Sequence, residues 1–184
     1  MTNEVNAAIA AARDMGATEI LVSDSHGNGE NLLMEQLPPD IHLVRAWPRP
    51  LMMMEGIDDS FDAAIFIGYH ASTANTEGVR AHTISSASLT AVRINGVDMM
   101  EASINAAIAG DFGVPVVMIS GDDATIEEAQ QIIGDMEGAV VKWNYGFHSA
   151  RTIMPEASYA LIGDRVRAAL GRLDDFDPYV MEGP

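Results

Sequence analysis

Apolar residues recur along the chain in two alternating patterns, one typical of helices and the other of buried strands. Helical spacing predicts helices over residues 1–15, 30–37, 99–111, 124–133 and 155–173. Short continuous apolar runs predict strands over residues 20–22, 41–47, 63–69, 114–119 and 139–145. Because strands and helices alternate, we expect an α/β fold with a mostly parallel sheet flanked by helices.

Turn residues predict one antiparallel β-hairpin within this order of strands and helices. Residues 89–94 and Val97 flank the pair Asn95 and Gly96, and this arrangement predicts a hairpin with a tight turn. No internal repeat, low-complexity segment or linker interrupts the pattern. We therefore expect a single α/β domain over residues 1–184.

Composition narrows the range of partners. The chain of 184 residues is 48% hydrophobic, and no apolar run approaches the roughly 20 residues of a membrane span. Its 27 acidic and 10 basic residues give a net charge of −17, which argues against nucleic acid and anionic membranes as partners. The first residues show no basic stretch followed by an apolar core, so no secretory signal is visible. Because there is no cysteine, any metal ion must be bound by histidine, aspartate or glutamate.

Polar candidates follow the predicted strands at their carboxyl ends, which is where open α/β sheets bind ligands. His26 follows the first strand, His70 follows the third, and the segment Ser120–Asp123 ("SGDD") follows the fourth. Two further candidates lie near these in the sequence. His82 comes after the loop that follows His70, and Glu101 lies in the first turn of the next helix.

Each candidate also has a purely structural explanation. The helix dipole favours an acid such as Glu101 in a first turn. Asp122 and Asp123 have the pattern of an N-cap followed by a first-turn acid. A single histidine in a strand-to-helix loop is usually a hydrogen-bonded loop residue. His42, inside a predicted strand, and His148, in an aromatic loop, are interpreted as structural.

Taken together, the candidates favour a metal centre. Imidazole nitrogens and carboxylate oxygens are the ligands that zinc accepts when no thiolate is available. We expect His26, His70 and Glu101 to supply metal ligands from neighbouring strand ends. Asp24 is expected to orient the imidazole of His26, and His82 to act as the catalytic acid–base or oxyanion stabiliser. No bridging carboxylate for a two-metal site stands out.

Six sequence blocks give this hypothesis a second basis. In order along the chain they are "MTNEVNAAIAAARDMGATEILVSDSHGNGENLL", "DDSFDAAIFIGYHA", "EGVRAHT", "INGVDMMEASINAAIAG", "VPVVMISGDD" and "VVKW". The blocks and their order resemble the D-aminopeptidase family of zinc metallopeptidases, and the resemblance extends over nearly the whole chain, from Met1 to Gly171.

The resemblance implies a cytoplasmic enzyme that binds two zinc ions per subunit. Such enzymes remove N-terminal D-residues, such as D-alanine, from short peptides and assemble as homodecamers of two stacked five-membered rings. Residue by residue, the resemblance implies that His26, His70 and Glu101 are zinc ligands and that His82 is the catalytic histidine.

The resemblance also implies a motif that the chain does not contain. Members of the family begin with a strand that ends in Ser-x-Asp-x-Glu-Gly, whose acids bind the zinc ions, and this strand would precede Met1. We therefore expect the chain to correspond to an internal portion of such an enzyme, shortened at both ends, and to be weakly active or inactive by itself. Asp135 and Glu137 occur in a similar "DMEG" motif, but we expect them at the opposite end of the sheet.

Two other functions remain as alternatives. The first is a non-catalytic binding or assembly module with the same fold. The second is an unrelated hydrolase or phosphatase that uses "SGDD", which the absence of a Gly-rich phosphate loop and of a G-x-S-x-G motif disfavours.

Overall fold

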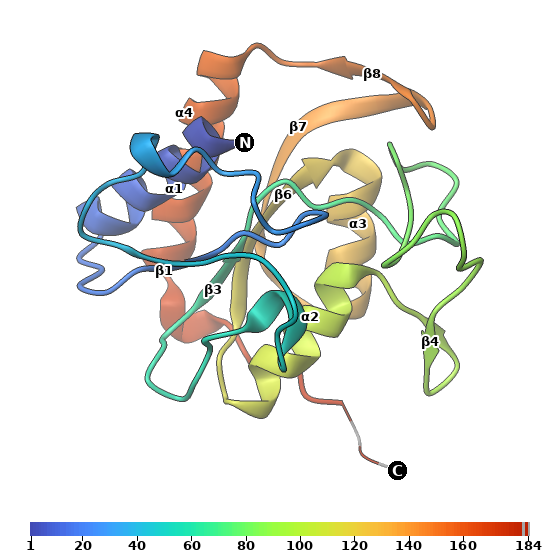
Figure 1. Ribbon diagram of the computed structural model, residues 1–184, viewed down its shortest axis with the longest axis horizontal. Helices are drawn as coiled ribbons and strands as arrows, with labels where there is room; N and C mark the ends of the chain where they lie inside the picture. The colour runs from blue at the N-terminus through green and yellow to red at the C-terminus, as the bar shows by residue number, and fades with distance from the viewer. Residues whose placement is uncertain (182, 184) are drawn as a thin grey trace.

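The computed structural model describes residues 1–181 and Gly183, and its core is a four-stranded sheet with helices on both faces (Figure 1). The order of strands in the sheet is β3–β6–β7–β8. These strands are β3 (Ala64–Phe66), β6 (Val116–Asp122), β7 (Glu137–Gly146) and β8 (Ser149–Thr152). The first three are parallel and β8 is antiparallel to β7, so the predicted α/β class with a mostly parallel sheet is confirmed.

Four helices cover the two faces of this sheet. They are α1 (Thr2–Asp14), α2 (Glu101–Asp111), α3 (Asp123–Ile132) and α4 (Pro155–Leu170). One buried cluster joins α1 and α4 to inward-facing strand residues, and a second joins α2 and α3 to residues of the opposite face (Figure 1). None of the helices in the described part of the chain has the length and apolarity needed to cross a membrane.

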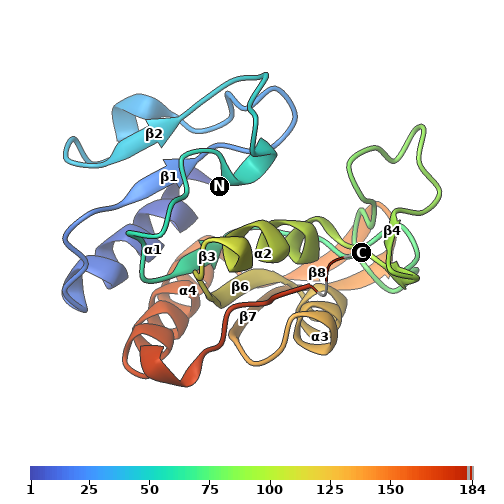
Figure 2. The ribbon, with the colours of Figure 1, turned by 90° about the horizontal axis from the view of Figure 1, so that it is seen from below.

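Two small sheets and three 3-10 turns complete the chain. The parallel pair consists of β1 (Leu21–Ser23) and β2 (His42–Val44), and the antiparallel hairpin consists of β4 (Arg93–Ile94) and β5 (Val97–Asp98). The 3-10 turns are η1 (Met34–Gln36), η2 (Met52–Met54) and η3 (Leu173–Asp175). Figure 2 shows the β1–β2 pair to one side of the main sheet.

Helix α1 connects the β1–β2 pair to the rest of the molecule. Val5 and Ile9 pack against apolar residues of the pair, while Ala8 and Ala12 belong to the cluster that covers the main sheet. One amphipathic helix therefore contacts both sheets, and the predicted helix over residues 1–15 is confirmed.

The helix predicted over residues 30–37 is wrong. Only the 3-10 turn η1 forms there, because side chains accept the backbone N–H groups that would begin a helix. Asp24 Oδ2 accepts from Asn31 N at 2.6 Å and from Leu32 N at 2.7 Å, and Thr2 Oγ1 accepts from Leu33 N at 3.1 Å. These bonds hold the segment in an irregular loop.

Strand β8 was not predicted, and some of the predicted strands extend beyond the observed ones. All four residues of β8 are exposed, so this strand has no apolar pattern in the sequence. The strand predicted over residues 41–47 ends at Val44, and Ala46 has a positive φ of 60°. The predicted hairpin around Asn95 and Gly96 is confirmed, although each of its strands has only two residues.

Asp122 joins three elements at the carboxyl end of the sheet. It is the N-cap of α3, and its buried Oδ1 accepts from the backbone N–H and the hydroxyl of Thr125 at 2.7 Å and 2.6 Å. Its Oδ2 accepts from Val79 N at 2.6 Å, which fixes the loop that follows β3. The structural interpretation of Asp122 is therefore confirmed.

We predict that Asp122→Ala lowers the free energy of unfolding by about 3 kcal/mol, because it removes an N-cap and leaves a buried N–H of Val79 without an acceptor. Asp123 is exposed in the first turn of the same helix, so Asp123→Ala should cost less than about 1 kcal/mol. Urea unfolding of both variants measures the difference. Equal losses in the two variants would contradict this role of Asp122.

Candidate metal centre

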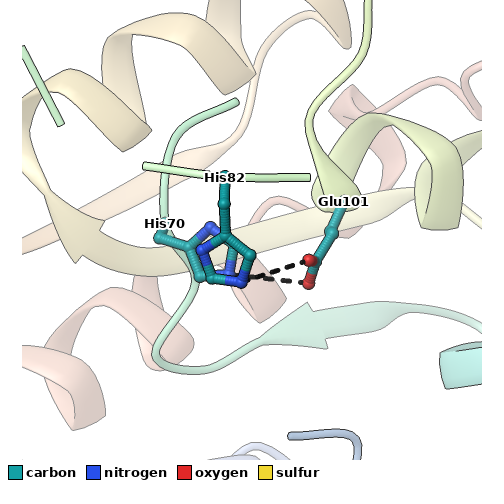
Figure 3. Close-up of side chains that lie close together, drawn as sticks. All are labelled: His70, His82 and Glu101. Atoms are coloured by element: carbon teal, nitrogen blue, oxygen red, sulfur yellow. Dashed lines mark ion pairs between the residues drawn. The ribbon is translucent and has the colours of Figure 1, made fainter. Parts of the chain in front are cut away.

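Three of the four predicted metal-site side chains lie together at the carboxyl end of the parallel strands. His70 follows β3, Glu101 begins α2, and His82 comes from the loop between them (Figure 3). Glu101 Oε2 lies 3.6 Å from His70 Nε2, and Glu101 Oε1 lies 3.8 Å from His82 Nε2. One potential ligand atom from each residue lies within 4.8 Å of the others.

The imidazole rings of His70 and His82 are parallel neighbours. Their centroids are 3.9 Å apart and their planes differ by 18°, so both rings present Nε2 toward the Glu101 carboxylate (Figure 3). The side chains are largely buried, with 17%, 22% and 11% exposed for His70, His82 and Glu101. Two ring nitrogens and one carboxylate thus converge on a partly enclosed point.

Backbone carbonyl groups select the tautomer of each ring. His70 Nδ1 lies 3.2 Å from Ala71 O, and His82 Nδ1 lies 2.6 Å from Arg80 O. Because a carbonyl oxygen can only accept, Nδ1 carries the proton in each neutral ring and Nε2 keeps its lone pair. This is the arrangement by which proteins orient histidine ligands toward a metal ion.

Burial favours the neutral form of His70. Desolvation lowers the pKa of its imidazole below the ordinary value, and the neighbouring His82 lowers it further. The Glu101 carboxylate acts in the opposite direction and raises the same pKa, but less than burial lowers it. His70 is therefore neutral at physiological pH and its Nε2 is available to a metal ion.

Short polar side chains hold the loop that carries His82. Thr73 Oγ1 accepts from Thr83 N at 2.8 Å, and Thr83 Oγ1 donates to Met99 O at 2.7 Å. Glu101 Oε1 accepts from Ile84 N at 2.8 Å, so the carboxylate of the cluster also fixes the residues that follow His82. The loop is therefore tied directly to the start of α2.

His26 is not part of this three-residue group, but it lines the same cavity. It is exposed, and the cavity of about 530 Å³ is lined by His26, His70 and Glu101 among others. The cavity follows β1 and β3, and in the described part of the chain each of these strands is paired along one side only. It therefore runs between two incompletely paired strands to the metal-site side chains.

Asp24 has a different geometry from the one expected. Its buried carboxylate accepts from the backbone N–H groups of Asn31 and Leu32 and from the side-chain amide of Asn31. The same amide donates to His26 O at 2.5 Å. Both oxygens of Asp24 are thus used by the loop, so this residue positions the backbone of His26 and its bonds do not reach the imidazole.

Other polar candidates have structural roles. Ser120 Oγ accepts from Gly68 N at 2.8 Å, so the "SGDD" segment is used to connect β6, β3 and α3. Glu137 begins β7 and is paired with Arg165 and Arg172, the latter of which also pairs with Asp135. The acids of "DMEG" therefore lie at the opposite end of the sheet, as predicted.

The two remaining histidines lie outside the cluster. His42 begins β2 and is exposed. His148 lies in the turn between β7 and β8, where its Nδ1 accepts from Arg80 Nη1 at 2.8 Å.

Lys142 is a charged residue near the cluster that the sequence analysis did not predict. Its positive charge contributes to lowering the pKa of His70. Its only sequence signal is that it is the single lysine of the chain.

Comparisons with known proteins show which family the chain resembles. The model of a family described as D-aminopeptidase matches residues 1–184. A D-aminopeptidase of Bacillus subtilis (strain 168) is 37% identical over 181 residues, which is 97% of this chain and 64% of the relative. The solved structure of the Zn-dependent D-aminopeptidase DppA from Bacillus subtilis, described as a self-compartmentalizing protease, has a TM-score of 0.92 and 34% identity. That similarity covers 98% of this chain and 65% of the solved chain, so the chain spans less than two thirds of the length of either relative.

The ligand set is tested by zinc affinity. If His70 and Glu101 bind zinc directly, we predict that His70→Ala and Glu101→Gln each weaken zinc binding by at least about 100-fold, whereas loss of an outer partner costs about 10–100-fold. His42→Ala is the matched control, since that histidine is exposed on β2, and it should leave the affinity unchanged. Competition with a chromophoric chelator measures all three variants. Equal affinity in His70→Ala and His42→Ala would exclude His70 as a ligand.

The electrostatic coupling within the cluster is tested without a metal ion. In the metal-free protein, Glu101→Gln removes the carboxylate that stabilises the His70 imidazolium, so the pKa of His70 should fall further below its ordinary value. His82→Asn removes a group that lowers the same pKa, and should therefore raise it. NMR titration of the imidazole carbon-bound protons measures both shifts. A rise in Glu101→Gln would contradict the described geometry.

Proposed function

The chain belongs to the D-aminopeptidase family, and from this premise we propose that it carries a catalytic site of a zinc-dependent aminopeptidase. The proposed reaction is hydrolysis of the peptide bond after an N-terminal D-residue, such as D-alanine, in a short peptide. The observation that carries the proposal is the convergence of His70, His82 and Glu101, which each place one potential ligand atom within 4.8 Å of the others. Both rings are already held in the tautomer that zinc requires.

The donor set fits zinc. Imidazole nitrogens and a carboxylate oxygen are the ligands of hydrolytic zinc sites, which leave one position open for water. A bound zinc ion would supply an activated water and would polarise the scissile carbonyl. Such a site needs residues that hold the ion and a residue that moves a proton, and the cluster contains both kinds.

We assign separate roles within the cluster. His70 and Glu101 are proposed to hold zinc, together with His26 from across the cavity for a second ion. His82 is proposed to accept the proton of the attacking water at Nε2 and to return it to the leaving amine. Its Nδ1 is held by Arg80 O at 2.6 Å, which keeps the ring oriented during both transfers.

The cavity suits a small substrate. Its volume of about 530 Å³ lies in the range of small-molecule sites, roughly 300–1,000 Å³. Apolar side chains such as Val22 and Ile67 line it, and it reaches the side chains of His70 and Glu101. This lining supports a short peptide whose scissile bond lies beside His70 and Glu101.

Further aspects of the proposal concern the assembly and its location. The solved relative is described as a self-compartmentalizing protease, which supports a homo-oligomer for this chain as well; we propose a decamer in the cytoplasm. His70 and Glu101 of the described cluster, together with His26 from across the cavity, are three proposed ligand side chains. Because a two-zinc site needs more ligands than these, we propose that the 184-residue polypeptide alone turns over slowly.

The reaction is tested with D-alanyl-D-alanine in the presence of zinc. We predict slow hydrolysis that a chelator abolishes, and no comparable hydrolysis of L-alanyl-L-alanine. His82→Ala should retain zinc and lower kcat by about 10²–10⁴-fold, because it removes the proton carrier. Turnover is measured by release of free D-alanine, with His42→Ala as the control.

Two outcomes would contradict the proposal. A protein that binds no zinc and hydrolyses neither peptide would favour a non-catalytic binding or assembly module with this fold. Loss of zinc in His82→Ala would show that His82 is a ligand and would transfer the role of proton carrier to another residue.

A further inference from the structure

The hairpin of β7 and β8 presents exposed aromatic rings and cations on a strongly acidic chain. Tyr145 and Phe147 are 73% and 44% exposed. Arg151 lies over the ring of Trp143 at 4.3 Å, and Arg80, from a neighbouring loop, lies over the ring of Phe147 at 5.5 Å. We call these five side chains the hairpin patch. In Figure 1 the hairpin that carries most of them extends beyond the helices that cover the sheet.

The two arginines of the hairpin patch have no acidic partner in the described part of the chain. Neither Arg80 nor Arg151 pairs with a carboxylate within residues 1–181 and 183, although the chain has 27 acidic residues. Arg80 donates instead to His148 Nδ1 at 2.8 Å. By contrast, five arginines are paired with acids, namely Arg13, Arg93, Arg165, Arg167 and Arg172. The positive charge of the hairpin patch is therefore available to an acidic surface.

A hollow with acidic walls provides a surface of the opposite charge. Its volume is about 450 Å³, and no basic residue lines it in the part of the chain that the structure describes. Its acidic side chains are Glu77, Asp98, Glu127 and Glu128. Asp98 is paired with Arg93, but the three glutamates have no cationic partner among the described residues. We call this surface the acidic hollow.

One buried hydroxyl in the wall of the acidic hollow also has no partner. Ser72 is 2% exposed, and its Oγ makes no hydrogen bond to the described residues. The backbone N–H of Ser72 donates to Glu128 Oε2 at 3.0 Å, as does the side-chain amide of Asn75. These bonds fix the carboxylate in the wall. A guanidinium group, which has five donors and no acceptor, suits a site that offers carboxylate and hydroxyl oxygens.

Hydrogen bonds hold the acidic hollow and the hairpin patch next to each other. Asn144 Nδ2 donates to Glu77 O at 2.7 Å, and Arg80 N donates to Phe147 O at 3.0 Å. The loop of residues 72–80 therefore lines the hollow and also contacts the hairpin. A surface with two complementary halves side by side suits a contact with an identical surface across a two-fold axis. Each half then meets the opposite half of the other copy.

Packing within one chain does not account for the hairpin patch. A tight turn requires small or polar residues, and the exposed rings of Tyr145 and Phe147 gain little burial there. Aromatic residues and arginine are the types that protein interfaces favour, and exposed groups of such residues mark interaction sites. The net charge of −17 makes copies of the chain repel one another, so their association needs local complementarity of this kind.

We propose that the hairpin patch of one copy docks on the acidic hollow of a second copy, and that the reverse contact forms at the same time across a two-fold axis. Arg151 faces the glutamates of the hollow, and the rings of Tyr145 and Phe147 are covered. This inference rests on the homo-oligomer of the proposed function and is independent of the peptidase reaction. A two-fold contact produces a dimer or a larger assembly with an even number of copies.

Two charge reversals test the contact. Arg151→Glu and Glu127→Arg should each weaken self-association by at least about 100-fold, because each places like charges opposite one another. The unmodified protein should sediment as a dimer or a larger even-numbered assembly, and each variant should have at most half of that mass at the same concentration. Arg45→Glu makes the same charge change just after β2, on the other side of the molecule (Figure 2), and should leave the mass unchanged. Thermal unfolding shows whether the variants are folded.

A mixture of the two variants separates the contact from a general effect on folding. In a mixed pair the new carboxylate at position 151 faces the new guanidinium at position 127, and the second contact of the pair is unmodified. Mixing Arg151→Glu with Glu127→Arg should therefore restore the mass of the unmodified protein, although neither variant assembles alone. Analytical ultracentrifugation measures the mixture.

The absence of cysteine allows the two surfaces to be linked directly. Tyr145→Cys mixed with Glu127→Cys should give a covalent pair with a short bis-maleimide, because these positions meet between copies. Tyr145→Cys mixed with Arg45→Cys is the matched control and should give no more of the mixed pair than the background. Equal yields in the two mixtures would exclude the proposed arrangement.

The outcomes distinguish this inference from the proposed peptidase function. An unchanged mass in both charge variants, or a mixture that stays dissociated, would exclude the contact. An unmodified protein that is monomeric but binds poly-glutamate through Arg151 would exclude a second copy as the occupant. Zinc-dependent release of D-alanine is measured on the same samples. Its absence from a correctly assembled protein would overturn the peptidase and leave the contact supported.

Discussion

The buried carboxylate of Asp122 fixes the edge of the sheet on which the candidate metal centre is built. Its oxygens accept from Thr125 at the start of α3 and from Val79 in the loop after β3. The adjacent Gly121 allows a close approach of backbones, because a Cβ there would lie 2.8 Å from Tyr69 O. Strand β6, helix α3 and the residues around His70 are thereby held together at one point.

The metal centre follows from this edge because parallel strands end on the same side of a sheet. β3 delivers His70 there, and α2, which leads into β6, begins there with Glu101. His82 depends on side-chain contacts within its loop, above all those of Thr73 and Thr83. Two proposed ligands, His70 and Glu101, are thus placed by topology, and His82 is placed by a local network of hydrogen bonds.

The sequence predicts the part of the site that topology controls and not the part that local contacts control. His70 and Glu101 are recognisable because each lies where a strand ends or a helix begins. His82 is a candidate because it lies close to His70 in the sequence, but no periodic pattern reports the hydrogen bonds within the loop that place it beside them.

The same distinction explains the errors in the predicted fold. The helix over residues 30–37 has the right apolar spacing, but the buried carboxylate of Asp24 takes the backbone N–H groups that the helix would use. Strand β8 is exposed along its length and pairs only through its backbone, so no side-chain pattern predicts it. In both cases, backbone hydrogen bonds decided the outcome and left no periodic signal in the residue types.

The two sides of the cavity are held in place by different interactions. The cluster of His70, His82 and Glu101 is built entirely on the main sheet, the loop after β3 and α2, which the bonds of Asp122 and Thr83 hold together. His26 lies on the other side, beyond a β1–β2 pair that is joined to the main sheet largely through the packing of α1. Because apolar packing of one helix restrains position less strictly than directional hydrogen bonds do, we expect the distance from His26 to the cluster to be less strictly fixed than the distances within the cluster. In the proposed assignment, a first metal ion would bind a preformed set of side chains, whereas a second ion would depend on how closely the two sides approach.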